Sequence, residues 1–232
     1  MGADRRSETL QRVLESAARL QAVVPDAVLV GGSAAALYAG HRDSLDHDHV
    51  LADLAQRYGE VLEAVEATEG WATSTRASRP PWTLLGSLDG VPAGLRQLRR
   101  TRPLETISVE VAPGTIVVAP TRDEALRVKA FLIVQRCAVR DFLDVVALSD
   151  AMGVATAADV LMAIDTWYVD RSQHPDSVRT ELVLRLADPQ PVDRDVLQEL
   201  PRYRNLAPRW HRWTDVVAAC QDLSVHMLGG EP

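Results

Sequence analysis

Hydrophobic residues follow two different periods along the chain, and the change of period divides the sequence near residue 120. In the first part, helical spacing alternates with short runs in which apolar and polar residues alternate. The elements predicted there are helices over residues 4–23 and 53–68 and strands over 28–30, 82–88, 93–98, 106–112 and 115–118. Asp89-Gly90 is a strong signal for a hairpin turn, because both central residues of that turn need positive φ.

After residue 120 the spacing is helical, and Thr121 with Glu124 is spaced as a capping box at the start of the first helix. The predicted helices lie near 122–150, 156–169, 176–187, 193–200 and 208–228, separated by glycine and by prolines such as His174-Pro175. The sequence therefore predicts an α+β fold. A mixed β-sheet, built mainly from hairpins and flanked by helices, forms an N-terminal domain (1–120), and a helical bundle forms a C-terminal domain (121–232).

Composition narrows the class of protein. The 232 residues are 47% hydrophobic, which is enough for a core without disulfide or metal staples. Cys137 and Cys220 form no Cys-x-x-Cys pair, so structural zinc and redox motifs are excluded. No secretory apolar core follows Met1, and no apolar run approaches the roughly 18 residues of a membrane span. We therefore expect a soluble cytoplasmic protein with no membrane partner.

Charge leaves one local question open. The net charge of −7 argues against a general nucleic-acid binder. Four arginines nevertheless crowd into seven residues, namely Arg96, Arg99, Arg100 and Arg102. They are either a solvated basic loop or a contact to a nucleic acid or a triphosphate.

The densest chemistry begins where the apolar run 28–30 is cut by Gly31 and Gly32. Ser33 stands at the position expected of an N-cap, and the alanines and leucine that follow it are strong helix formers. A strand that opens directly onto a helix N-terminus leaves free backbone N–H groups. These groups favour an anion such as a phosphate.

A second strand-like segment follows this helix and carries alternating aspartates and histidines. Asp46 and Asp48 share one face of the expected strand, whereas His47 and His49 share the other. Two neighbouring carboxylates repel each other unless a cation lies between them, and hard oxygen ligands suit Mg²⁺ that holds a triphosphate. The order of the two segments therefore indicates nucleotide chemistry.

The spacing Gly31-Gly32-Ser33, His41-Arg42-x-Ser44 and Asp46-x-Asp48 resembles the signature of the nucleotidyltransferase superfamily, in particular its AbiEii-like branch of type IV toxin–antitoxin and abortive-infection proteins. The resemblance implies a nucleotidyltransferase-like domain over 1–120. It also implies an NTP substrate with Mg²⁺, or Mn²⁺, as cofactor. By the same resemblance, the metal ligands are Asp46 and Asp48, and the nucleotide-binding residues are Gly31, Gly32, Ser33, Arg42 and Ser44.

A later segment resembles the same family, which pairs a lysine with a downstream Arg/Lys-Asp-x-x-Asp. Lys129, Arg136 and Arg140 share one face of the predicted helix over 122–150. By the resemblance, Lys129 contacts the triphosphate, Arg136 and Arg140 bind the nucleotide, and Asp141 is the catalytic or positioning carboxylate. Asp144 remains the alternative to Asp141. The helical domain over 121–232 would thus complete the active site.

The resemblance also implies a third carboxylate on a later strand, for which Glu110 is the best-placed residue, and it points to a tRNA 3′ end as acceptor and to a cognate antitoxin as partner. Three alternatives stay open. A small molecule of the antibiotic type could be the acceptor, or the fold could serve as a catalytically silent binding module. The third alternative, a His/Asp metallohydrolase, is disfavoured because strand alternation separates the histidines from the aspartates.

Overall fold

A computed structural model describes residues 7–171 and 177–229 of the chain. Its contacts divide the chain into two compact units. The first unit holds Met1–Leu37 and Asp43–Thr121, and the second holds Tyr38–Arg42 and Arg122–Pro232. The short segment Tyr38–Arg42 therefore belongs with the later helices, although it interrupts the sequence of the first unit.

A five-stranded mixed sheet forms the centre of the first unit, as predicted. In spatial order its strands are β1 (Val28–Val30), β2 (His47–Leu51), β5 (Val91–Gln97), β4 (Thr83–Leu88) and β3 (Trp71–Thr73). β2 and β5 are parallel, with Asp48 opposite Gly94, and the other neighbouring pairs are antiparallel. The predicted hairpin turn between β4 and β5 is confirmed, since Asp89 and Gly90 both have positive φ, at 49° and 75°.

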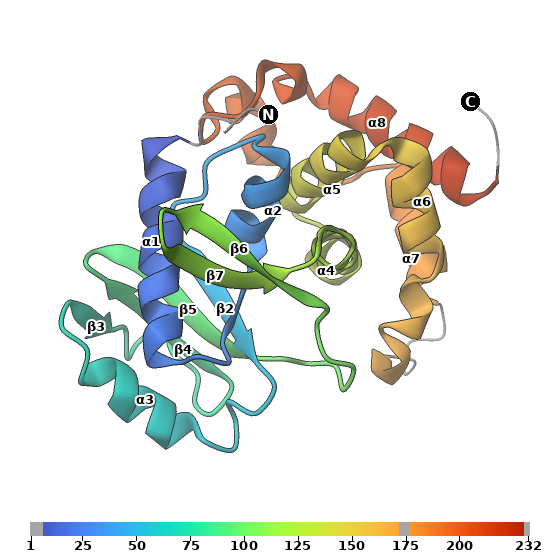
Figure 1. Ribbon diagram of the computed structural model, residues 1–232. Coiled ribbons are helices and arrows are strands. Elements are labelled where there is room, and N and C mark those ends of the chain that lie inside the picture. The colour runs from blue at the N-terminus through green and yellow to red at the C-terminus, as the bar shows by residue number, and fades with distance from the viewer. Residues whose placement is uncertain (1–6, 172–176, 230–232) are drawn as a thin grey trace. The chain divides into compact units, whose positions relative to one another are not determined.

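One face of this sheet is covered by α1 (Glu8–Val23) and α3 (Tyr58–Glu66) (Figure 1). Leu20 of α1 and Val65 of α3 pack there in one core with sheet residues such as Leu51 and Leu95. β2 alternates between buried and partly exposed residues along its length, so His47 and His49 lie on the buried face. Burying this continuous apolar layer is the main favourable term for the unit.

Two expectations for the first unit are wrong. The residues of β6 (Thr106–Ala112) and β7 (Thr115–Pro120) were expected in the main sheet, but within the described chain these two strands pair with each other as a separate two-stranded sheet. The reason is the core that β7 forms with α1 and β1, where Val117 packs with apolar residues of both. The helix expected over 53–68 begins only at Tyr58, because the preceding residues form turns.

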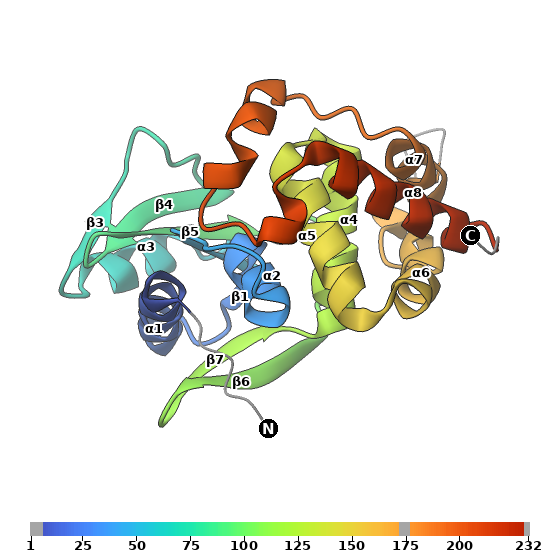
Figure 2. The same cartoon turned by 90° about the horizontal axis from the view of Figure 1, so that it is seen from above.

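The second unit is built from helices. They are α4 (Arg122–Arg136), α5 (Val139–Met152), α6 (Val154–Met162), α7 (Val178–Ala187) and α8 (Trp213–Met227), with 3₁₀ segments at Ile164–Thr166, Val169–Arg171, Arg194–Arg202 and Pro208–Trp210. α4 contacts α5, α6 and α7, and α8 packs against α5, α6 and α7 (Figure 2). The predicted bundle is present, but the helices expected over 156–169 and 193–200 are partly or wholly 3₁₀. The His174-Pro175 boundary lies outside the described residues.

The single helix expected over 122–150 is two helices. Cys137 has a positive φ of 51° and ends α4. The new N-terminus is satisfied from a distant part of the chain, because the Val139 N–H donates to Asp193 Oδ1 at 2.7 Å and the Val192 N–H donates to the Cys137 carbonyl at 2.9 Å. Helix ends need such partners for their unpaired backbone groups. The break therefore depends on a tertiary contact.

Among the described residues, no single helix is long and apolar enough to cross a membrane. The pair α5 and α6 reaches that length and hydropathy only when taken together, and it is bent by 116° at Gly153.

Two glycines should respond to alanine in opposite directions. A Cβ at Gly86 on β4 would lie 2.6 Å from the Ala72 carbonyl oxygen and from the Trp71 ring, whereas a Cβ at Gly59 in α3 would meet nothing within 4 Å. Gly86→Ala should lower the free energy of unfolding by about 1 to 3 kcal/mol through overpacking. Gly59→Ala should raise it by up to about 1 kcal/mol through helix propensity. Urea unfolding of both variants measures the two changes, and a stable Gly86→Ala protein would contradict the β3–β4 packing.

Candidate active site

Gly31 opens α2 (Gly31–Ala39) directly after β1, so the predicted strand-to-helix junction is present. The prediction that Ser33 is the N-cap is wrong, because the helix begins two residues earlier. Instead, the Ser33 hydroxyl donates a hydrogen bond to the carbonyl of Asp46. This bond ties the first turn of α2 to the segment that carries the aspartates. The backbone N–H groups of the first turn still supply the dipole and donors that suit an anion.

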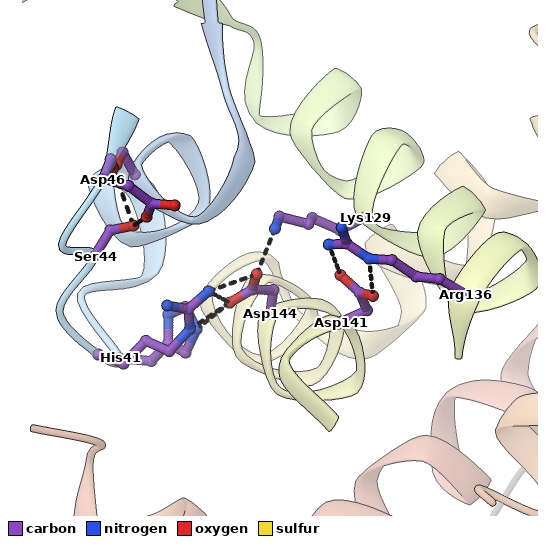
Figure 3. Close-up of polar contacts among 9 residues, drawn as sticks. His41, Ser44, Asp46, Lys129, Arg136, Asp141 and Asp144 are labelled. Carbon is purple, nitrogen blue, oxygen red and sulfur yellow. Dashed lines mark hydrogen bonds and ion pairs between the residues drawn. The ribbon is translucent and has the colours of Figure 1, made fainter. Parts of the chain in front are cut away.

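Asp46 and Asp48 both have partly exposed side chains, and each has a different partner. The Ser44 hydroxyl donates to Asp46 Oδ1 at 3.1 Å, as drawn in Figure 3. Arg96 on β5 forms an ion pair with Asp48, with 3.2 Å between Nε and Oδ1. One carboxylate is thus held by a neutral hydroxyl and the other by a cation.

The space around Asp48 is kept open by glycines. A Cβ at Gly94 would lie only 2.4 Å from Asp48 Oδ1, and a Cβ at Gly31 would lie 3.5 Å from Asp48 Cβ. The absence of both side chains leaves room for the Asp48 carboxylate beside the start of α2. The donor set fits Mg²⁺, which prefers oxygen ligands and binds through one or two carboxylates, waters and substrate phosphates.

His47 and His49 are fully buried on the opposite face of β2, with ring centroids 5.2 Å apart. Burial lowers the pKa of His47 to about 4 and holds the pKa of His49 well below its ordinary value. The His47 Nε2 lies 3.0 Å from the Ser16 hydroxyl of α1. Neutral buried rings of this kind belong to the core. The separation of histidines from aspartates that disfavoured a metallohydrolase is therefore present in the structure.

In the second unit, Asp144 on α5 is the centre of a buried ion cluster (Figure 3). Arg42 donates to its carboxylate through Nε at 2.8 Å and Nη2 at 2.9 Å. Lys129 Nζ lies 2.6 Å from Oδ2, and His41 Nε2 lies 2.8 Å from Oδ1. All four side chains are at most 3% exposed.

The electrostatics of the cluster follow from this arrangement. Burial alone would raise the pKa of Asp144, but Arg42, Lys129 and His41 together hold it well below its usual range. Burial also lowers the pKa of His41, against the opposing effect of Asp144. The cluster is therefore a carboxylate held by two permanent cations and one imidazole.

Asp141 forms an ion pair of its own, apart from the Asp144 cluster. Arg136 Nε and Nη2 each donate to its carboxylate at 2.7 Å in a two-pronged ion pair. The expectation that Lys129, Arg136 and Arg140 share one helical face is wrong. The helix breaks between α4 and α5, so Arg140 lies on a different helix from the other two. The structure thus brings Lys129 to Asp144, the alternative carboxylate, and Arg136 to Asp141.

Glu110 lies on β6, and its Oε1 accepts a hydrogen bond from the Gly114 N–H in the turn of its own hairpin at 3.0 Å. The part of the chain that the structure describes contains no group of three or more His, Cys, Asp or Glu side chains that could hold a metal ion. The structure therefore does not bring Glu110 together with Asp46 and Asp48.

Sequence reasoning missed two residues that the structure places beside the aspartates. Arg96 was seen only as one member of a basic cluster, and Gly94 carried no signal at all. Arg100 of the same cluster is buried and donates to the backbone carbonyls of Arg102 and Pro103, so it is a structural residue. Arg96 differs from the other arginines of the cluster because β5 pairs with β2 and so brings Arg96 to Asp48. This pairing of strands could have been found only from the fold.

Replacing the carboxylate at the centre of the buried cluster should be costly. Asp144→Asn removes the buried carboxylate that Arg42 and Lys129 both contact, so the free energy of unfolding should fall by about 3 to 5 kcal/mol. Asp150→Asn on the same helix is the matched control. It removes an exposed ion pair with Arg209 and should cost less than about 1 kcal/mol. Denaturant unfolding of both variants is the measurement, and equal losses would contradict a buried Asp144.

No protein-family profile matches the chain. The chain is 29% identical to the heme uptake protein MmpL11 of Mycobacterium tuberculosis over 96% of its own length and 23% of the relative. It is 38% identical to the mycolic acid-containing lipids exporter MmpL11 of Mycolicibacterium smegmatis over 56% of its length and 13% of the relative. The chain thus spans at most about a quarter of the length of these curated relatives.

Two solved structures resemble almost the whole chain. MenT4, a nucleotidyltransferase toxin of Mycobacterium tuberculosis, matches with a TM-score of 0.58 and 15% identity over 97% of this chain and 87% of MenT4. JHP933 of Helicobacter pylori matches with a TM-score of 0.53 and 16% identity over 97% of this chain and 94% of JHP933. At such low identity the likeness concerns the fold, and the chain has a nucleotidyltransferase fold.

Proposed function

We propose that the chain is an Mg²⁺-dependent nucleotidyltransferase that moves a nucleoside monophosphate from an NTP to an acceptor hydroxyl. One observation carries the proposal. In the first unit, the N-terminus of α2 and the aspartate segment are joined by the Ser33–Asp46 hydrogen bond, and Gly31 lies against Asp48. A phosphate-binding helix end next to two carboxylates is the combination that a metal-bound triphosphate requires.

Each residue of this arrangement has a role in the proposal. Asp46 and Asp48 hold Mg²⁺, or Mn²⁺, and Ser44 orients the Asp46 carboxylate through its hydroxyl. The backbone N–H groups of Gly32 and Ser33 donate to phosphate oxygens of the NTP. The bound metal supplies charge stabilisation for the attacking and leaving oxygens.

The reaction is an in-line displacement at the α-phosphorus. The acceptor oxygen forms a bond to this phosphorus, the bond to the bridging oxygen breaks, and pyrophosphate leaves. The proton of the acceptor hydroxyl passes to water. The chain contributes mainly by holding the triphosphate so that the reacting atoms are aligned.

Three cations of the second unit already have carboxylate partners there. Lys129 forms an ion pair with Asp144, and Arg136 forms one with Asp141, both within the second unit. Arg42 donates two hydrogen bonds to the Asp144 carboxylate within the same unit. Arg140 and Asp141 remain predictions for nucleotide binding and catalysis.

We also propose an RNA acceptor, the 3′ end of tRNA, and a cognate antitoxin as partner. The support is the family resemblance of the motif between Gly31 and Asp48 and the fold shared with MenT4, whose name describes a nucleotidyltransferase toxin. The alternatives within the same site are a small-molecule hydroxyl and a silent binding module. The first predicts transfer of the nucleotide to a small molecule, and the second predicts nucleotide binding without transfer.

Asp48→Asn should reduce nucleotide transfer by at least about a hundredfold, because a metal ligand and its charge are lost. Purified protein is incubated with Mg²⁺, each α-³²P-labelled NTP in turn and total tRNA, and the products are resolved on a denaturing gel. Label in tRNA from the unmodified protein, lost in Asp48→Asn, is the expected result.

Asp53→Asn is the matched control, since the half-exposed Asp53 carboxylate pairs with Arg57 four residues along the chain, and the variant should retain full activity. Label in tRNA that survives Asp48→Asn would rule out Asp48 as a metal ligand. Label in a small molecule but not in tRNA would support the antibiotic-type acceptor. NTP binding by calorimetry without transfer to any acceptor would support the silent module.

A further inference from the structure

The carboxylate of Asp48 is already neutralised by a cation of the chain itself. Arg96 Nε lies 3.2 Å from Asp48 Oδ1, and the two side chains are 45% and 31% exposed. Asp46 differs, because its carboxylate accepts a hydrogen bond from a hydroxyl and its negative charge is not neutralised by a nearby cation in the described contacts. A nearby cation therefore offsets the negative charge of Asp48, whereas the hydroxyl that contacts the Asp46 carboxylate is neutral.

Strand register explains why this arginine reaches this aspartate. β2 and β5 run parallel with Asp48 opposite Gly94, and Arg96 follows Gly94 by two residues on the same face of β5. Any side chain at residue 94 would collide with Asp48 Oδ1, at 2.4 Å from the Cβ, and with Leu85 at 3.0 Å. Gly94 thus lets the Asp48 carboxylate extend across β5 to the guanidinium group.

A pair with this exposure is weak enough to exchange. Exposed ion pairs contribute little to stability, because water screens both charges and the long side chain loses rotamer freedom. Arg96 is also the type of side chain that binds phosphate well, with a planar fork of donors that matches phosphate oxygens. It can therefore leave Asp48 when a better anion is present.

We propose that Arg96 is an exchangeable counter-ion that makes the site select the metal–triphosphate complex over the metal alone. The proposal rests on the proposed function. Without nucleotide, the guanidinium group competes with a divalent cation for Asp48 and repels it. When metal and triphosphate bind together, Arg96 turns from Asp48 to a phosphate oxygen, so the competition becomes a favourable contact.

This exchange predicts effects of opposite sign in one variant. Arg96→Gln should bind Mn²⁺ alone about three- to tenfold more tightly than the unmodified protein, since one nearby positive charge is removed. The same variant should bind Mn²⁺ with a non-transferable nucleotide more weakly by a similar factor. A purely structural role for Arg96 would shift both affinities in the same direction or neither.

The measurement is Mn²⁺ binding by electron paramagnetic resonance, first alone and then with the α,β-methylene analogues of ATP, GTP, CTP and UTP in turn. Arg99→Gln is the matched control, because it removes an equal charge from an exposed side chain that lies three residues after Arg96. It should change both affinities less than about twofold. Arg96→Lys keeps the charge and should restore the affinity for Mn²⁺ alone. Thermal unfolding confirms that each variant is folded.

The possible outcomes distinguish a failure of the Arg96 exchange from a failure of the proposed metal site. Mn²⁺ binding that depends on Asp48, tested with Asp48→Asn, but is unchanged or weakened in Arg96→Gln overturns the exchange and leaves the metal site intact. Mn²⁺ binding that is absent, or indifferent to Asp48→Asn, overturns the metal site and the exchange together. Tighter metal and weaker metal–nucleotide binding in Arg96→Gln alone establishes the exchange.

Discussion

The two-residue alternation of β2 is the constraint on which the candidate site depends. His47, His49 and Leu51 point into the core under α1 and α3, so Asp48 must point to the other face. A slip of one residue would bury a carboxylate among leucines and expose two imidazoles, at a cost that no local contact could offset. The burial of one face of the sheet thus determines which side chains of β2 remain accessible on the other.

The aspartates Asp144 and Asp48 differ in burial and in the number of their charged partners. This difference indicates a structural role for Asp144 and an exchangeable ion pair for Asp48. Asp144 is fully buried and surrounded by Arg42, Lys129 and His41, and this arrangement is expensive to disturb because buried cations in a low-dielectric interior depend on the carboxylate beside them. Asp48 is partly exposed and has one weak partner. A buried cluster of the first kind fixes the local chain conformation, whereas an exposed pair of the second kind can exchange partners when a ligand arrives.

Local features were predictable from the sequence, and features made by distant contacts were not. The Asp89-Gly90 turn and the alternation at residues 46–49 depend on backbone preferences that neighbouring residues reveal. The break at Cys137 has no glycine or proline to announce it, since Asp193 caps the new helix from 54 residues away. The pairing of Lys129 with Asp144 follows from that break, because in a continuous helix the two residues would lie about 22 Å apart along the axis.

Gly94 illustrates why the surroundings of a site are harder to predict than its chemistry. Asp46 and Asp48 can be recognised because two carboxylates at that spacing need a reason to be together, and the reason suggests a cation. A glycine inside a strand usually indicates only a weaker strand or a close approach of another group. Here the approaching group is the Asp48 carboxylate, and the missing side chain also sets the path along which Arg96 meets it. The parallel pairing of β2 with β5 therefore does more than extend the sheet, since it places one acidic and one basic side chain next to each other, as the proposed exchange with a metal and a phosphate requires.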